Sequence, residues 1–249
     1  MRPAKLAGMQ HAAPPAAPAM SNAAPQRPRT AVALGMVGAL GEELLAALVG
    51  GSRYATVHVA VDQWIGSAAA RFKPWLPGQG VVVADDAYLC VTGPETFVPK
   101  ASPMQRVAAE GIAQAARTAR DCGAQRLVLV APLPALLQLN AASHTLSSPA
   151  EVEIAGMGFE TLVVVRPTAD AAPPPGGWLP GLIRTFTRMV LEIMLPQRVQ
   201  ALRASVAAGA IVHAVERAGP GIHVLGAADL AAIVAETMPG ALPRKLRVR

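Results

Sequence analysis

The sequence predicts an α/β fold in which a doubly wound parallel sheet has helices on both faces. Short apolar runs, which are typical of buried strands, alternate along the chain with longer stretches that have apolar residues at helical spacing. Alanine, valine and leucine supply the core, since only 4% of the 249 residues are aromatic. The first apolar run leads into a glycine-rich turn, and sheets of this class bind ligands beyond the carboxyl ends of their strands.

The glycine-rich turn lies between a strand expected at 31–34 and a helix expected at 42–48. Gly35, Gly38 and Gly41 have the spacing G-x-x-G-x-x-G. The first glycine allows a tight turn, the second lets the backbone approach a pyrophosphate, and the third lets helix and strand pack closely. The helix N-terminus directs free N–H groups toward the phosphates. We therefore predict that a dinucleotide contacts seven consecutive residues: Gly35, Met36, Val37, Gly38, Ala39, Leu40 and Gly41. A glycine-rich turn without a ligand is the alternative.

The later elements follow from the same two periodicities. Further strands are expected at 55–61, 72–76, 87–92, 125–131, 161–165 and 221–225, with 81–83 as an approach to the strand at 87–92. Helices are expected at 67–71, 103–122, 150–156, 178–194, 205–217 and 227–237. The run QRLVLVA at 125–131 is continuously apolar after its first two residues, as in a central strand. Gly123 ends the long helix, whose apolar stripe contains Val107, Ile112 and Ala115.

Two tails flank a single globular region expected at 30–238. Residues 1–29 are rich in alanine and proline and lack apolar periodicity, so we expect a disordered extension, in which Met20 is an alternative start to Met1. Residues 239–249 form a basic tail. Four basic and no acidic side chains precede Thr30, and four more basic side chains follow Glu236. The formal charge of +6 therefore belongs to the tails, because the region between them has 14 basic against 16 acidic side chains. This distribution argues against specific nucleic-acid binding.

Metal and membrane proteins are also disfavoured. Cys90 and Cys122 have the spacing of neither a metal site nor a disulfide framework, so we expect no metal. No uninterrupted apolar run reaches the ~18 residues of a membrane span, and the N-terminus lacks the apolar core of a signal peptide. We therefore expect a cytoplasmic protein.

Asp62 lies just past the strand expected at 55–61, 21 residues after Gly41. An acid at this position can accept hydrogen bonds from the adenosine ribose hydroxyls, and it would repel a 2′-phosphate. A turn or helix-cap role is the alternative. Electrostatics favours NAD over NADP, although Arg53 or Arg71 could reach a 2′-phosphate.

The segment 178–194 has apolar residues at helical spacing, with Arg184, Arg188 and Glu192 in a row on the other side. We favour an ordinary packed amphipathic helix. A substrate lid, a surface for a protein or small-molecule partner and a membrane-surface helix are the alternatives.

Several segments match a known family in order. The glycine motif at 35–41 is followed by DAYLCVTG, which is similar to a family strand whose terminal glycine, here Gly93, lies near the adenine ribose. The segments ARTARDCGAQRLVLVA, PAEVE and GFETLVVVRP come next, and LPQRVQALRASVAAGAIVHAV resembles the late segment that closes the substrate side. Together they resemble the atypical short-chain dehydrogenase/reductase superfamily, and within it bacterial NAD(P)-binding proteins related to the human Tat-interacting protein. The resemblance covers about residues 30–234. It implies a Rossmann-like fold with a small C-terminal substrate-side region, and a cofactor contact at Ala131, Arg166 and Pro167.

The chain departs from the catalytic pattern of this family. Its reductases use a serine and a Tyr-x-x-x-Lys pair, in which the tyrosine is the general acid/base and the lysine lowers its pKa. The serine position falls on Ala131 and the lysine position on Pro149, with Thr145 four residues earlier. The only tyrosines are Tyr54 and Tyr88, and no Tyr-x-x-x-Lys occurs anywhere in the chain.

His144 lies in the loop where the family tyrosine would lie, and an imidazole can act as a base near neutral pH. A polar loop residue is the alternative, and we name no other catalytic residue. Structural roles are expected for three further histidines, His58, His213 and His223. The acidic pair Asp85 and Asp86 precedes a strand, and we expect it to be a turn or cap pair.

Two functional hypotheses follow, and the sequence leaves open whether the chain is an enzyme. The first is an NAD(P)-binding protein without reductase activity, a cofactor-responsive regulator or scaffold. The second is an oxidoreductase or isomerase that acts on a small molecule with a non-standard catalytic residue. A structural interaction protein that binds no dinucleotide is a third class, which the glycine motif argues against.

Overall fold

The computed structural model describes residues 28–66, 69–80, 82–93, 98, 102–133, 145–146, 148–168 and 202–238. Within them lies one seven-stranded parallel sheet with the order β3-β2-β1-β4-β5-β6-β7. The strands are β1 (Arg29–Leu34), β2 (Tyr54–Ala60), β3 (Phe72–Trp75), β4 (Asp86–Cys90), β5 (Arg126–Val130), β6 (Thr161–Arg166) and β7 (Gly221–Gly226). The predicted doubly wound, Rossmann-like α/β class is confirmed. The expected tails and the 178–194 helix lie outside the described residues, apart from Pro28 and Arg29.

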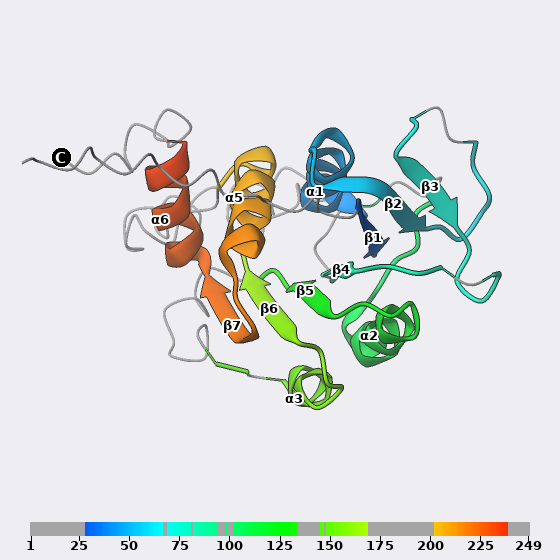
Figure 1. Ribbon diagram of the computed structural model, residues 1–249. Coiled ribbons are helices and arrows are strands. Elements are labelled where there is room, and N and C mark those ends of the chain that lie inside the picture. The colour runs from blue at the N-terminus through cyan, green and yellow to red at the C-terminus, as the bar shows by residue number, and fades with distance from the viewer. Residues whose placement is uncertain are drawn as a thin grey trace, which may run out of the picture.

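The helices cover both faces of the sheet (Figure 1). One face carries α1 (Gly38–Gly50), α5 (Ala204–Arg217) and α6 (Ala227–Thr237). The other carries α2 (Ile112–Asp121), which follows the 3₁₀ turn η1 (Ala109–Gly111), and α3 (Pro149–Ala155). Strand residues alternate between the two cores, as a period of two requires. Ala31 and Ala33 pack on the α1 side, whereas Val32 and Leu34 pack on the α2 side.

The helix expected at 103–122 is only partly right, because α2 begins at Ile112. The preceding segment is extended and lies along the carboxyl ends of two strands. The N–H of Asp62 donates to the Pro103 carbonyl at 2.8 Å, and that of Thr92 donates to the Val107 carbonyl at 2.8 Å. These backbone groups are therefore satisfied by the sheet rather than by a helix.

The edge of the sheet at β3 is less covered than expected. Residues 69–71 form a bend and turn rather than the end of a short helix, and residues 82 and 83 are not in a strand. No described residue in the connections from β2 to β3 or from β3 to β4 is helical. This leaves strand residues near the edge partly exposed. No helix in the described part of the chain is long and apolar enough to cross a membrane.

A charged cluster lies at the amino-terminal ends of the central strands. Asp86 is 0% exposed and binds the guanidinium groups of Arg29, Arg53 and Arg126, with N–O distances of 2.7, 3.3 and 3.6 Å. The Tyr54 hydroxyl donates to Asp86 at 2.6 Å. The expected role of Asp86 as a turn or cap residue is therefore wrong, because its carboxylate is buried among cations from three different segments. Arg29, which we expected in the N-terminal extension, lies in β1.

Candidate functional site

The glycine motif forms the junction between β1 and α1. Gly35 has φ +69°, and a Cβ on it would lie 2.1 Å from the Cys90 carbonyl oxygen at the end of β4. The Val37 N–H donates to the Gly35 carbonyl at 2.8 Å, which makes the turn tight. Any side chain at Gly35 would therefore displace β4, so this position requires glycine.

The other two glycines set the start of the helix. Gly38 is the first residue of α1 and has φ +73°. A Cβ on Gly41 would lie 2.9 Å from the Met36 carbonyl carbon, so the helix packs on the turn at the third glycine. No side chain caps the helix at Val37, and the first turn contains no acidic residue. The positive end of the helix dipole is thus not neutralised by the helix itself, which suits a bound anion.

This junction lies where the order of the strands reverses. β1 pairs with β2 on one side and with β4 on the other, and chain connections leave β1 and β4 in opposite directions. In open α/β sheets such a switch point forms the crevice that receives ligands. The predicted phosphate loop therefore occupies the position in the sheet that its chemistry requires.

The remaining predicted contacts lie along the same edge of the sheet. Asp62 follows β2, is exposed, and has no side-chain hydrogen bond or ion pair within the described residues. Gly93 follows β4 and Ala131 follows β5, and both are half-buried. Pro167 follows β6 and is buried. The structure thus brings residues from five strand ends to one edge.

The side chain of Arg166 forms a buried ion pair with Glu151. It is 1% exposed, and its Nη2 donates to Glu151 Oε2 at 2.7 Å. Glu151 also forms a capping box with Ser148 at the start of α3. A buried charge is tolerated when it is paired in this way. Arg166 therefore anchors α3 on β6, and its predicted contact with a cofactor stays a prediction.

Positions 131, 145 and 149 are where the resemblance to short-chain dehydrogenases would place the catalytic serine, tyrosine and lysine, and they differ in residue type and in local structure. β5 ends before Ala131, which has no hydroxyl. α3 begins at Pro149, with Ser148 as its N-cap, so Thr145 precedes the helix. A Tyr-x-x-x-Lys pair needs both side chains on one face of a helix, because residues four apart face the same side. Helix α3 starts too late to present positions 145 and 149 in that way. His144 lies outside the described residues.

The cysteines and two of the histidines lie outside the glycine junction. Cys90 and Cys122 are buried free thiols, and burial raises the pKa of the Cys90 thiol to about 12. The imidazole of His223 hydrogen-bonds the Gly219 carbonyl at 2.9 Å, which is a structural role. His58 instead lines a surface pocket, which sequence reasoning did not find because the pocket depends on the pairing of β2 with β3. No group of three potential metal ligands is found among the described residues.

No protein-family model and no curated protein matches the sequence. Among solved structures, the chain is similar to the Bordetella bronchiseptica enzyme WbmF in complex with NADH, at 14% identity over 89% of this chain and 80% of that one, with a TM-score of 0.42. It is similar to WbmH of the same organism in complex with NAD+, at 13% identity over 87% and 85% of the two chains, with a TM-score of 0.43. A Burkholderia thailandensis oxidoreductase of the short-chain dehydrogenase/reductase family matches at 13% identity over 84% and 97%, with a TM-score of 0.43. Likeness at this level identifies no function, and the strand order defines the fold on its own.

Proposed function

We propose that this chain is a dinucleotide-binding protein of the short-chain dehydrogenase/reductase type that acts as a cofactor-responsive regulator or scaffold. The observation that carries the proposal is the glycine turn at the switch point between β1 and β4. There Gly35 faces the Cys90 carbonyl, with room for no side chain, and the uncapped N-terminus of α1 follows.

Three contacts would hold the dinucleotide. The turn at 35–41 receives the pyrophosphate on backbone N–H groups, because Gly38 has no side chain to keep phosphate oxygens away. Asp62 accepts hydrogen bonds from the adenosine ribose hydroxyls, and Gly93 lies beside the adenosine. The carboxylate of Asp62, which has no side-chain partner among the described residues, would repel a 2′-phosphate, so we propose NAD as the preferred cofactor.

The nicotinamide half of the site offers little help with proton transfer. A bound nicotinamide supplies hydride-transfer chemistry, but carbonyl reduction also requires a proton donor at the substrate oxygen. Ala131 has no proton to give, and Pro149 has no charge with which to lower the pKa of a neighbour. Binding without turnover is therefore the function that this arrangement supports best.

Calorimetric titration with NAD, NADH, NADP and NADPH tests the proposal. We expect at least one to bind, with NAD and NADH tighter than their phosphorylated counterparts. Gly38→Asp should abolish binding, because it adds bulk and negative charge at the pyrophosphate position. Gly219→Asp is the matched control, since Gly219 is exposed and no atom lies within 4 Å of a Cβ placed there.

The outcomes are separable. If none of the four binds to folded protein, or if Gly38→Asp binds as tightly as wild type, the site assignment is wrong. If a bound dinucleotide changes its redox state during a screen of carbonyl and alcohol substrates, followed by absorbance at the reduced nicotinamide band, the chain is an oxidoreductase rather than a regulator.

A further inference from the structure

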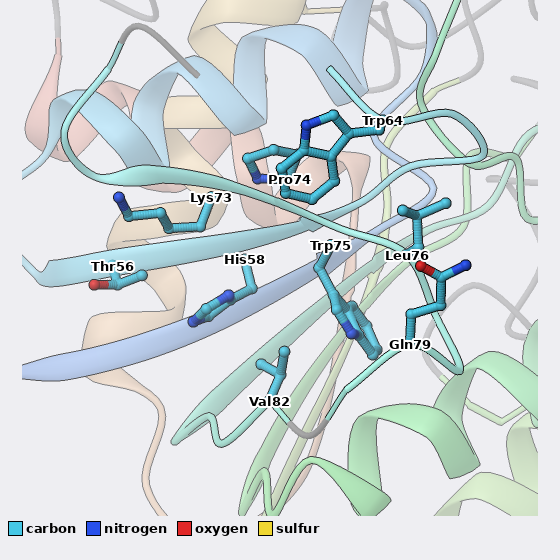
Figure 2. A pocket seen from close by; sticks show the side chains of 9 residues that line it. All are labelled: Thr56, His58, Trp64, Lys73, Pro74, Trp75, Leu76, Gln79 and Val82. Carbon is cyan, nitrogen blue, oxygen red and sulfur yellow. The ribbon is translucent and has the colours of Figure 1, made fainter. Parts of the chain in front are cut away.

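A pocket of about 480 Å³ lies at the β2–β3 edge of the sheet. Figure 2 shows its lining side chains, which come from β2, from β3 and from the segments that follow each strand. None of them belongs to the residues assigned to the dinucleotide. Its volume is within the range of pockets that bind small molecules.

Strand register explains why these side chains meet. His58 pairs with Lys73 and Ala60 pairs with Trp75 across the parallel strands. Since alternate residues of a strand share a face, Thr56 and His58 project on the same side as Lys73 and Trp75. Ala60 and Trp75 belong to the core beneath α2, so the pocket continues this core outward to the edge.

The polar side of the pocket is suited to an anion. None of its nine lining residues is acidic, and Lys73 is exposed and forms no ion pair within the described residues. Burial, followed by the charge of Lys73, lowers the pKa of His58. Its imidazole is therefore neutral at pH 7 and can donate one hydrogen bond. The hydroxyl of Thr56 and the amide of Gln79 add further donors at the rim.

The other side of the pocket is aromatic and apolar. Trp64 is 70% exposed, which is a large exposed fraction for an indole. Trp75 is 7% exposed, and its buried Nε1 has no hydrogen-bond partner among the residues that the structure describes. Pro74, Leu76 and Val82 complete the apolar lining. Such walls accept a flat apolar body, because aromatic rings stack or meet edge to face.

We propose that this pocket binds a small aromatic carboxylate, with the carboxylate at Lys73, Thr56 and His58 and the ring against Trp64 and Trp75. The carboxylate end of this ligand matches Lys73, which forms no ion pair within the described residues, and the ring matches the exposed indole of Trp64. The lining residues include none of those assigned to the dinucleotide, so the proposal stands whether or not the chain binds a dinucleotide.

Calorimetric titration with 2-naphthoate as the probe tests the proposal, with the uncharged 2-naphthamide as its isosteric counterpart. We expect saturable binding of 2-naphthoate and about tenfold weaker binding of the amide, as loss of a charge-assisted hydrogen bond predicts. Lys73→Met keeps the aliphatic stem and should weaken 2-naphthoate about tenfold without affecting the amide. Trp64→Ala should weaken both probes by about tenfold through loss of aromatic contact.

Arg217→Met is the matched control, because it removes an exposed cation from α5, whose partner is Glu236 on α6. It should leave binding of 2-naphthoate unchanged. Three results would overturn the proposal: no saturable binding, equal affinity for acid and amide, or an unchanged affinity in Lys73→Met. Saturating NAD should leave the affinity within about twofold, whereas competition would place the probe in the dinucleotide crevice and also overturn the proposal.

Discussion

All strands of the parallel sheet begin at one edge, the amino-terminal edge, and end at the other, the carboxyl-terminal edge. These two edges are built in opposite ways. At the amino-terminal edge, charged and phenolic side chains fill the space between strands, and Asp86 is completely buried among them. At the carboxyl-terminal edge, the glycines of the turn at 35–41 place no side chain over the backbone N–H groups. Asp62 has no side-chain partner within the described residues. We infer from this difference that the amino-terminal edge stabilises the fold, and we propose that the carboxyl-terminal edge binds the ligand. Substitutions at the two edges should therefore have separable effects.

The largest effect is expected for Asp86→Asn. The substitution removes the negative charge that Arg29, Arg53 and Arg126 share, so these partly buried guanidinium groups lose their common buried partner. We expect the free energy of unfolding to fall by about 3–5 kcal/mol. Urea denaturation followed by circular dichroism measures this. A loss below about 1 kcal/mol would show that water already satisfies the arginines.

Gly38→Asp should have the opposite profile. Dinucleotide affinity should fall by at least about 100-fold, since a carboxylate would lie where two phosphates bind. Stability should fall by only about 1 kcal/mol, because aspartate tolerates the positive φ of this position better than most residues. Denaturation and calorimetry on the same sample separate the two quantities. A large stability loss with intact binding would contradict the division between the edges.

Stability at alkaline pH should report on the amino-terminal edge. Burial raises the pKa of Tyr88 to about 12, from 10.0 in the absence of the fold. Burial, the Tyr88 charge and Asp86 also raise the pKa of Tyr54. A raised pKa contributes stability that is present below pH 10 and is lost as the pH rises toward 12. The Tyr88 shift corresponds to about 2–3 kcal/mol.

Tyr88→Phe is the control for this pH dependence. It keeps the ring against Tyr54, with which Tyr88 makes an edge-to-face contact at a centroid distance of 6.0 Å. The variant should lose less stability than wild type between pH 9 and pH 11. Parallel curves for the two proteins would assign the alkaline loss to other groups.

Asp62→Arg should have a smaller effect, confined to ligand choice. Replacing an exposed acid with a cation should shift the ratio of NAD to NADP affinity toward NADP by about tenfold or more. The free energy of unfolding should change by no more than about 0.5 kcal/mol, because the side chain has no partner in the described part of the chain to lose. Competition titrations with the two dinucleotides measure the ratio. If the ratio is unaltered, Asp62 is only a turn residue.

The double substitution Thr145→Tyr and Pro149→Lys should have the least effect. It introduces the Tyr-x-x-x-Lys pattern, but α3 begins at position 149, so the two side chains do not share a helical face. We expect no reductase turnover with carbonyl substrates and reduced dinucleotide. Measurable turnover would show that this half of the site needs only the residues and not a longer helix.

Local pattern predicted those features that neighbouring residues determine. The spacing of Gly35, Gly38 and Gly41 predicted the β1–α1 junction, because a tight turn and close packing act over a few residues. The helix at 103–122 was predicted too long, since backbone hydrogen bonds to Asp62 and Thr92 hold its first residues extended. Those partners lie just beyond the ends of β2 and β4, outside this segment of the sequence.

The features that depend on strand pairing were not predicted. Asp86 lies opposite Arg126 and beside Ala31 in the sheet, and its further partner Arg53 is 33 residues away in sequence. The pocket at β2 and β3 likewise requires His58 to lie next to Lys73. Charge and periodicity give no register between strands, so only the assembled sheet shows these contacts.

A crystal structure of the chain with the dinucleotide that binds it most tightly would test the dinucleotide site directly. We expect pyrophosphate oxygens within hydrogen-bond distance of backbone N–H groups in the turn at 35–41, with the adenosine ribose at Asp62. A dinucleotide bound elsewhere, or a turn at 35–41 that contacts no phosphate, would contradict this assignment.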